Sequence, residues 1–260
     1  MKYAIILGNL GNTNDRFLAS GYKEQPTKEE MLKRAAAIEG VEGVELVGTW
    51  DITMDNVEEV GGLLAKYNPK CASIIPDHFA QKRWGNGAFS AKDPAIRAQA
   101  VEETAKMAEA ALALGCDLIS LWPGQDGYDY CFQADYRQER LWIEEAVRSL
   151  AQRVGESNVG VTIDTGHSFV AGENVAEAEV MLSMYGDKLF YLREIGYRGW
   201  YSMDQYPYRE EAQGALRESI EFLKAIDRLL DQKSIGEIRE LVRRGDAVQS
   251  TRWLRKRFLS

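Results

Sequence analysis

The chain has 260 residues, of which 45% are hydrophobic and 28% charged, and this is enough apolar sequence for one large folded domain. Its formal net charge of -8 would repel a phosphate backbone, which disfavours nucleic acid as a partner unless charge is strongly segregated, and we expect a small polar substrate. No apolar run approaches the roughly 20 residues that cross a bilayer, and the apolar start at residues 3–8 is too short for a signal peptide. We therefore expect a cytoplasmic protein with no membrane partner.

The first half of the chain alternates strand patterns with helix patterns. The predicted strands are residues 3–7, 44–47, 71–75 and 117–121, and the predicted helices are residues 27–38, 54–67, 94–114 and 133–154. Thr27 and Glu30 form a capping box at the start of the first helix. Asp93 followed by Pro94 is a typical start for the third helix, and Gly115 is a typical stop.

Four strand–helix units in a row predict a parallel sheet, in which the carboxyl ends of the strands build the site. The loops after these strands are rich in aromatic and polar side chains. They carry Asn9, Trp50, Asp51, His78, Trp84, Trp122, Gln125, Asp126, Tyr128 and Tyr130. A tryptophan in a loop is more often packing than a sugar platform, but several at successive strand ends favour a binding site.

The alternation breaks after Val154, where the chain enters the next strand pattern without a full unit between. The later predictions are a strand at 159–163, a helix at 175–185, the start of a strand at 188–191, a strand and turn at 200–207, and a helix at 210–230. Ser234 and Glu237 predict a capping box for a short helix, and residues 252–258 form a basic amphipathic tail. We expect a barrel domain over residues 1–232 and a helical extension over 233–260, packed on the barrel or on a partner through Trp253, Leu254 and Phe258. The alternative for the basic tail is binding to an anionic partner.

The stretch from Gly160 to Ser168 is the centre of the functional argument. Val159, Val161 and Ile163 alternate with small or polar residues, so a short strand delivers Asp164 and His167 at its carboxyl end. Oxygen and nitrogen ligands suit a divalent ion such as Mn²⁺, Co²⁺, Mg²⁺ or Zn²⁺. The alternative is an Asx turn with the histidine packed beneath it.

The cysteines Cys71, Cys116 and Cys131 are odd in number and lack a Cys-x-x-Cys spacing. This pattern argues against a disulfide framework and against a thiolate metal site. We expect reduced and mostly buried side chains.

Three segments together resemble the sugar isomerase/epimerase TIM barrels, the xylose-isomerase-like superfamily, and within it the L-rhamnose-isomerase-like branch. They are residues 122–130 (WPGQDGYDY), 160–168 (GVTIDTGHS) and 201–207 (YSMDQYP), and they occur in the order of that family. The resemblance implies a (β/α)8 barrel, either complete or open, that binds one or two divalent ions, with Mn²⁺ favoured. It also implies a homo-oligomer, a dimer or a tetramer, that interconverts aldoses and ketoses.

By this resemblance Asp164, His167 and Asp204 are the catalytic and metal-binding residues. Trp122 is similar to a wall of the sugar pocket, and His78 is placed near the ring or terminal oxygens of the sugar. Trp50 and Trp84 add flat apolar faces for the C–H side of the sugar. The chain departs from the family where a glutamate and a lysine on the fifth strand, and a histidine and an aspartate loop on the seventh, are expected.

Three functions follow from these observations. The first is a metal-dependent aldose–ketose isomerase for an unphosphorylated sugar, because no Gly-rich phosphate cradle is present. The second is a metal-poor, sugar-binding remnant of the same barrel that has lost the chemistry. The third is an endonuclease-IV-like hydrolase, which two histidines on an acidic chain disfavour.

Overall fold

The computed structural model describes residues 1–14, 17–124, 128–155, 159–160, 189–190 and 192–258. The chain divides into two compact units. The sheet unit comprises Lys2–Thr162 and Trp200–Gln213, and the helical unit comprises Met1, Ile163–Gly199 and Gly214–Ser260. In the described part of the chain, no helix combines the length and apolar character that crossing a bilayer requires.

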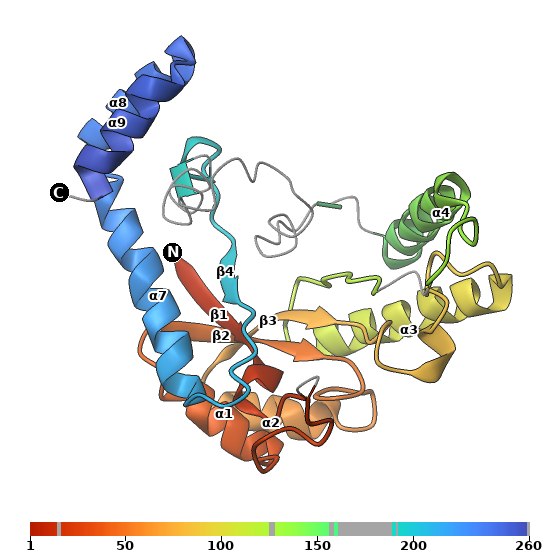
Figure 1. Cartoon of the computed structure of the whole chain (residues 1–260). Coiled ribbons are helices and arrows are strands. Elements are labelled where there is room, and N and C mark those ends of the chain that lie inside the picture. Colours follow the sequence, from red (N-terminus) through yellow and green to blue (C-terminus); the bar gives the residue numbers. More distant parts are fainter. Residues whose placement is uncertain (15–16, 125–127, 156–158, 161–188, 191, 259–260) are drawn as a thin grey trace. The chain divides into compact units, whose positions relative to one another are not determined.

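The sheet unit is built on four parallel strands in the order β3-β2-β1-β4 (Figure 1). They are β1 (Lys2–Ile6), β2 (Val41–Val47), β3 (Lys70–Ile75) and β4 (Trp200–Met203). A parallel bridge from Ile74 to Ile119 adds a further neighbour beside β3. The strand nearest the end of the chain therefore lies beside the first strand, which is the neighbour relation that closes a (β/α)8 barrel.

Helices of the sheet unit pack against this sheet and against one another. The described helices are α1 (Lys28–Ala36), α2 (Val57–Tyr67), α3 (Pro94–Ala113), α4 (Tyr136–Val154), α7 (Ala212–Leu229), α8 (Gln232–Arg244) and α9 (Ala247–Phe258), with the short 3-10 turns η1 (Leu7–Leu10) and η2 (Lys82–Trp84). In the sheet unit, α1 contacts β2 and α2, while α3 contacts β3 and α4 (Figure 1). This succession of strand, helix and parallel strand confirms the predicted βα alternation.

The helix starts follow from capping chemistry. Thr27 accepts a hydrogen bond from the Glu30 backbone N–H at 3.2 Å, as its capping box predicts. Asp93 accepts one from the Ala95 N–H at 2.8 Å and precedes Pro94, as predicted for α3. Gly115 then adopts φ 64° directly after the helix, in the left-handed region that glycine tolerates best.

The core lies on both faces of the strands. Ala4, Ile5, Val44, Leu46 and Ile74 are all fully buried, as expected for a parallel sheet covered by helices. A second cluster joins α3, α4 and the loop after β3. It contains Trp84, Ala88, Phe89, Ala100, Ala146 and Leu150.

Three local predictions were wrong. The pattern at 188–191 predicted a strand, but Leu189 and Phe190 have helical backbone, because two adjacent apolar residues fit either structure. The cap of α8 is Asp231 rather than Ser234, since its carboxylate accepts from the Ser234 N–H at 2.7 Å. Residues 117–121 form only an isolated bridge at Ile119 in place of a full strand.

The remaining predictions divide between confirmed and untested. The basic tail is helical, and within the helical unit Trp253 Nε1 donates to Glu237 at 2.6 Å. Cys116 is buried and Cys71 is half-buried, as expected, whereas Cys131 is exposed. The predicted strand at 159–163 lies largely outside the described residues, and the predicted helix at 175–185 lies wholly outside them.

Candidate functional site at the carboxyl ends of the strands

Three aromatic side chains meet where successive strands end. Trp50 follows β2, Phe79 follows β3, and Trp122 follows the bridge at Ile119. The rings of Trp50 and Phe79 lie edge-on with centroids 5.5 Å apart, and those of Phe79 and Trp122 lie 4.4 Å apart. Trp50 and Trp122 keep 52% and 44% of their surface exposed. We call these three side chains the aromatic rim.

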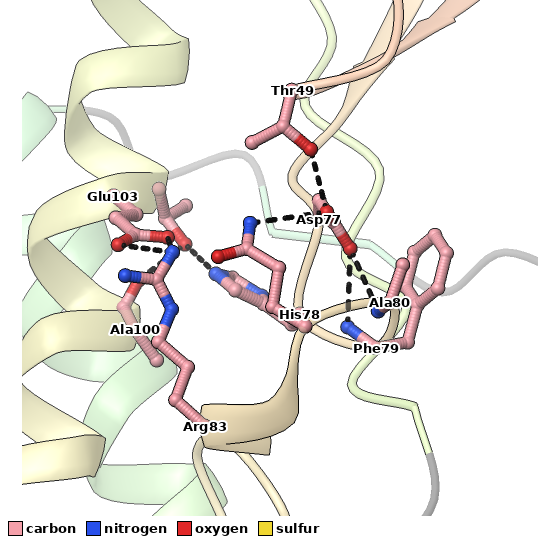
Figure 2. Close-up of polar contacts among 10 residues, drawn as sticks. Thr49, Asp77, His78, Phe79, Ala80, Arg83, Ala100 and Glu103 are labelled. Carbon is pink, nitrogen blue, oxygen red and sulfur yellow. Dashed lines mark hydrogen bonds and ion pairs between the residues drawn. The ribbon is translucent and has the colours of Figure 1, made fainter. Parts of the chain in front are cut away.

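Asp77 fixes the loop that carries the rim residue Phe79 (Figure 2). Its carboxylate accepts from Thr49 Oγ1 at 2.6 Å, from the Ala80 N–H at 2.9 Å and from Gln81 Nε2 at 3.2 Å. Burial alone would raise the pKa of Asp77, but these hydrogen bonds outweigh it and hold the pKa below its ordinary value. Asp77 is therefore an ionised structural anchor that ties the β2 and β3 loops together.

Glu45 lies on β2, the strand that the rim residue Trp50 follows, and carries a buried carboxyl group. Burial raises its pKa, the neighbouring Ser73 and Ser202 hydroxyls oppose this, and the Asp204 carboxylate adds to it. Both hydroxyl oxygens are buried, and neither has the distance and angle of a standard hydrogen bond to another described residue. A buried polar group without a partner is costly, so this arrangement is suited to holding a hydroxyl-bearing ligand or water.

Comparison with known proteins identifies the architecture. Residues 32–152 match the model of the family described as "Xylose isomerase-like TIM barrel". The D-allulose 3-epimerase of Methylomonas sp. superposes with a TM-score of 0.56 at 16% identity, covering 87% of this chain and 98% of that one. The 3-keto-D-glucoside 4-epimerase of E. coli gives 0.56 at 14% identity, covering 86% and 100%.

The fold is that of the xylose isomerase-like TIM barrels. A third barrel, the D-psicose 3-epimerase of Clostridium cellulolyticum H10 with D-tagatose, has a TM-score of 0.54 at 14% identity, covering 90% of this chain and 94% of that one. The xylose isomerase of Thermus thermophilus is 24% identical over 91 residues, which are 35% of this chain and 24% of that protein. This chain thus matches about a quarter of the length of that curated relative.

Only part of the predicted metal site falls within the described barrel. Asp204 is exposed immediately beyond β4, while Asp164 and His167 lie outside the described residues. Across the ranges that the structure describes, no three histidine, cysteine, aspartate or glutamate side chains group in a way that could hold an ion. The described residues therefore do not complete a ligand set, and we derive no reaction step through a metal.

His78 and Trp84 were predicted to contact the sugar, but both lie in the core of the sheet unit. They are 1% and 2% exposed, and the His78 ring meets Trp84 and Phe89 edge-on at 5.4 Å and 4.7 Å. Because Thr104 Oγ1 donates to the Ala100 carbonyl, it accepts from His78 Nε2 at 3.3 Å, which assigns the ring proton to Nε2 (Figure 2). Burial lowers the pKa of His78 to about 4, so the ring is neutral packing and offers no surface to a sugar.

Two members of the barrel site were missed by the sequence analysis. Phe79 follows β3 directly but was overlooked beside the more conspicuous His78. Glu45 stands between the buried residues Val44 and Leu46. An acid flanked by two apolar residues was the sequence feature that could have indicated an inward-facing carboxyl group. Of the other loop residues named from the sequence, Gln125 and Asp126 lie outside the described residues.

Proposed function

We propose that this protein is an isomerase or epimerase of a free, unphosphorylated monosaccharide that acts on the hydrogen of a carbon beside the carbonyl group. The aromatic rim is the observation that carries the proposal. Three rings from three successive loops present an exposed apolar surface at the end of a barrel where TIM-barrel sites form. Such a surface suits the C–H face of a sugar, whose hydroxyl groups then point toward polar partners.

A neutral sugar fits this surface better than a sugar phosphate. The rim residues Trp50, Phe79 and Trp122 carry no charge, and the chain contains no Gly-rich phosphate cradle. Solved barrels of the same fold are described in complex with D-allulose and with D-tagatose. Both ligands are ketoses, and they support a free monosaccharide as the substrate class.

We propose two candidate reactions in order of preference. Our first choice is interconversion of an aldose and a ketose, as the resemblance to L-rhamnose-isomerase-like barrels implies. The second is epimerisation of a ketose, which the similarity to two 3-epimerases favours. Both reactions change the hydrogen on a carbon beside a carbonyl group, so the product distinguishes them.

Glu45 is our candidate for holding the proton in this chemistry. A carboxyl group whose pKa is raised by burial keeps its proton to a higher pH than an exposed glutamate, which suits a group that exchanges a proton with a substrate. Ser73 and Ser202 lie beside it with hydroxyls that lack a full hydrogen-bond partner among the described residues. These hydroxyls could orient a sugar hydroxyl against the acid.

Asp164, His167 and Asp204 are the residues that we propose to hold a divalent ion, Mn²⁺ first, with Co²⁺, Mg²⁺ or Zn²⁺ as alternatives. Such an ion supplies a Lewis acid that polarises a carbonyl oxygen. Elemental analysis of protein purified with Mn²⁺ tests this: wild type should retain the ion, and Asp164→Asn should lose most of it. Equal metal in both proteins would contradict the assignment.

The remnant alternative keeps the barrel and the aromatic rim but lacks turnover. The sequence departures at the fifth and seventh units favour it, because two expected ligands are missing there. Calorimetric titration separates the two cases: a remnant would bind a ketose without converting it, whereas an isomerase would do both. The endonuclease-like hydrolase is the least favoured of the three functions, because the chain has only two histidines.

Rim substitutions test the sugar platform. Trp50→Ala and Trp122→Ala should each raise KM about 10-fold, since a lost ring contact costs about 1.4 kcal/mol, with smaller effects on kcat. Leu112→Ala is a matched control, because Leu112 is 79% exposed on α3 and belongs to neither rim loop. Unchanged KM in both tryptophan variants would show that the rim does not bind substrate.

A further inference from the structure

Two cysteines occupy equivalent positions on neighbouring segments of the sheet. Ile74 of β3 is bridged to Ile119 in parallel register. The Ile74 N–H donates to the Leu118 carbonyl at 3.0 Å, and the Ser120 N–H donates to the Ile74 carbonyl at 2.9 Å. Cys71 lies three residues before Ile74, and Cys116 lies three residues before Ile119. The two cysteines therefore precede this bridge by the same number of residues on two neighbouring segments.

The local contacts agree with this placement. Cys71 Sγ donates to the Ser73 carbonyl at 3.6 Å, and Cys116 Sγ donates to the Leu118 carbonyl at 3.5 Å, so each thiol points toward the residue two positions further along its own segment. The two thiols also interact with each other: this contact raises the pKa of Cys71 and lowers that of Cys116. Glu45 lies near both thiols, which places them toward the same side of the sheet.

Neighbouring strands lie about 4.8 Å apart, and disulfides join Cα atoms that are about 4.4 to 6.8 Å apart. We propose that Cys71 and Cys116 form a reversible disulfide when the protein meets a peroxide, and that this pair is a redox modification site of the barrel. The proposal does not rest on the sugar chemistry, although Glu45, our candidate acid, lies near both thiols. It concerns the amino-terminal ends of the strands, opposite the aromatic rim.

The chemistry balances with one molecule of peroxide. Cys116, as the thiolate, attacks one peroxide oxygen, the O–O bond breaks, and hydroxide leaves to take up the proton that Cys116 released, giving water and a sulfenic acid. Cys71 sulfur then attacks the Cys116 sulfur, the S–O bond breaks, and a second water leaves with the Cys71 proton. Two thiols are oxidised by two electrons, and the peroxide is reduced to two waters.

The third cysteine provides an internal control. Cys131 is exposed and belongs to the loop before α4, so it should react with bulky thiol reagents but has no described cysteine beside it. Cys116 is 4% exposed and Cys71 is half-buried, so only a small oxidant should reach the pair in the folded protein. A polyethylene-glycol maleimide should therefore label one thiol of three in the native protein.

The experiment uses the full chain with Cys131→Ser, treated with hydrogen peroxide and denatured without reductant. We expect an intact mass lower by two hydrogen atoms, restored by dithiothreitol, and a peptide map that links Cys71 to Cys116. Adding Cys71→Ser or Cys116→Ser should abolish the mass loss and give oxygen addition instead. The oxidised parent should also melt at a higher temperature than the reduced one, because a crosslink restricts the unfolded chain.

The proposal is overturned if the Cys131→Ser protein keeps both thiols after peroxide, or gains only oxygen atoms. It is also overturned if the only disulfides formed join two separate chains. Should a serine variant fail to fold, the peptide map of the folded parent still gives the decisive result.

Discussion

Asp51 illustrates how the structure sets a pH dependence at a single residue. Its side chain is 3% exposed and accepts a hydrogen bond from the Val47 N–H at 2.9 Å. Burial raises the pKa of Asp51, whereas the Val47 hydrogen bond and the charge of Lys28 lower it. The effect of burial is larger, and the pKa rises from 3.8 to about 6. The fold therefore favours the neutral acid. The resulting stability is fully present below about pH 4 and is lost as the pH rises through 6.

Asp51→Asn should remove this dependence, because the amide oxygen can still accept the Val47 bond and carries no charge. The shift of about two pKa units corresponds to about 3 kcal/mol, so we expect the variant to gain about 1 to 3 kcal/mol over wild type at pH 8 and little at pH 4. Urea unfolding at pH 4, 6 and 8 measures this. Asp55→Asn, an exposed neighbour, is the control. If the unfolding free energies of Asp51→Asn and wild type changed equally with pH, this explanation would be contradicted.

Single residues also mark where prediction from sequence stopped. Trp50 and Trp122 could be placed at strand ends because parallel strands bring their carboxyl ends to one edge. Whether a loop aromatic faces solvent or the core depends on packing between segments distant in sequence, so Trp84 and His78 could not be told from rim residues. Glu45 was missed for the same reason, since strand alternation does not tell which face is inside a barrel.

At the scale of elements, caps were predictable wherever one side chain alone reached the helix terminus. Thr27 and Asp93 accept the bonds that their positions predict. At α8 the sequence offers both Asp231 and Ser234, and the carboxylate at Asp231 accepts from both the N–H and the hydroxyl of Ser234. A sequence pattern cannot choose between two candidate capping residues that lie three positions apart, and only the backbone geometry decides between them.

Asp93→Ala should destabilise the protein by about 1 kcal/mol, because the Ala95 N–H loses its acceptor at the start of α3. Asp129→Ala removes an exposed carboxylate that caps no described helix and should change stability by less than about 0.5 kcal/mol. Both values come from urea unfolding at pH 7 and low salt. An equal loss in the two variants would show that charge, rather than the cap, accounts for the effect.

At the scale of the whole molecule, βα alternation was enough to predict a parallel sheet, and the resemblance to xylose-isomerase-like proteins implied that the sheet belongs to a barrel. The observed order β3-β2-β1-β4 and the match of residues 32–152 bear this out. The later part of the chain was harder to predict because its apolar segments are short and fit strand and helix alike, as at Leu189 and Phe190. The barrel fold brings Trp50, Phe79 and Trp122 together at the ends of successive strands, and this aromatic rim is the basis of the proposed sugar chemistry.

The most direct test is whether the purified chain converts one free sugar into another. Wild-type protein with Mn²⁺ would be incubated with single ketohexoses, aldohexoses and 6-deoxy sugars, and the products resolved by chromatography. We predict that at least one sugar gives an isomer, an aldose from a ketose or a 3-epimer, and that Asp204→Ala gives none while keeping the wild-type circular dichroism spectrum. Folded, Mn²⁺-supplied wild-type protein that converts no sugar in the panel would contradict the proposed function.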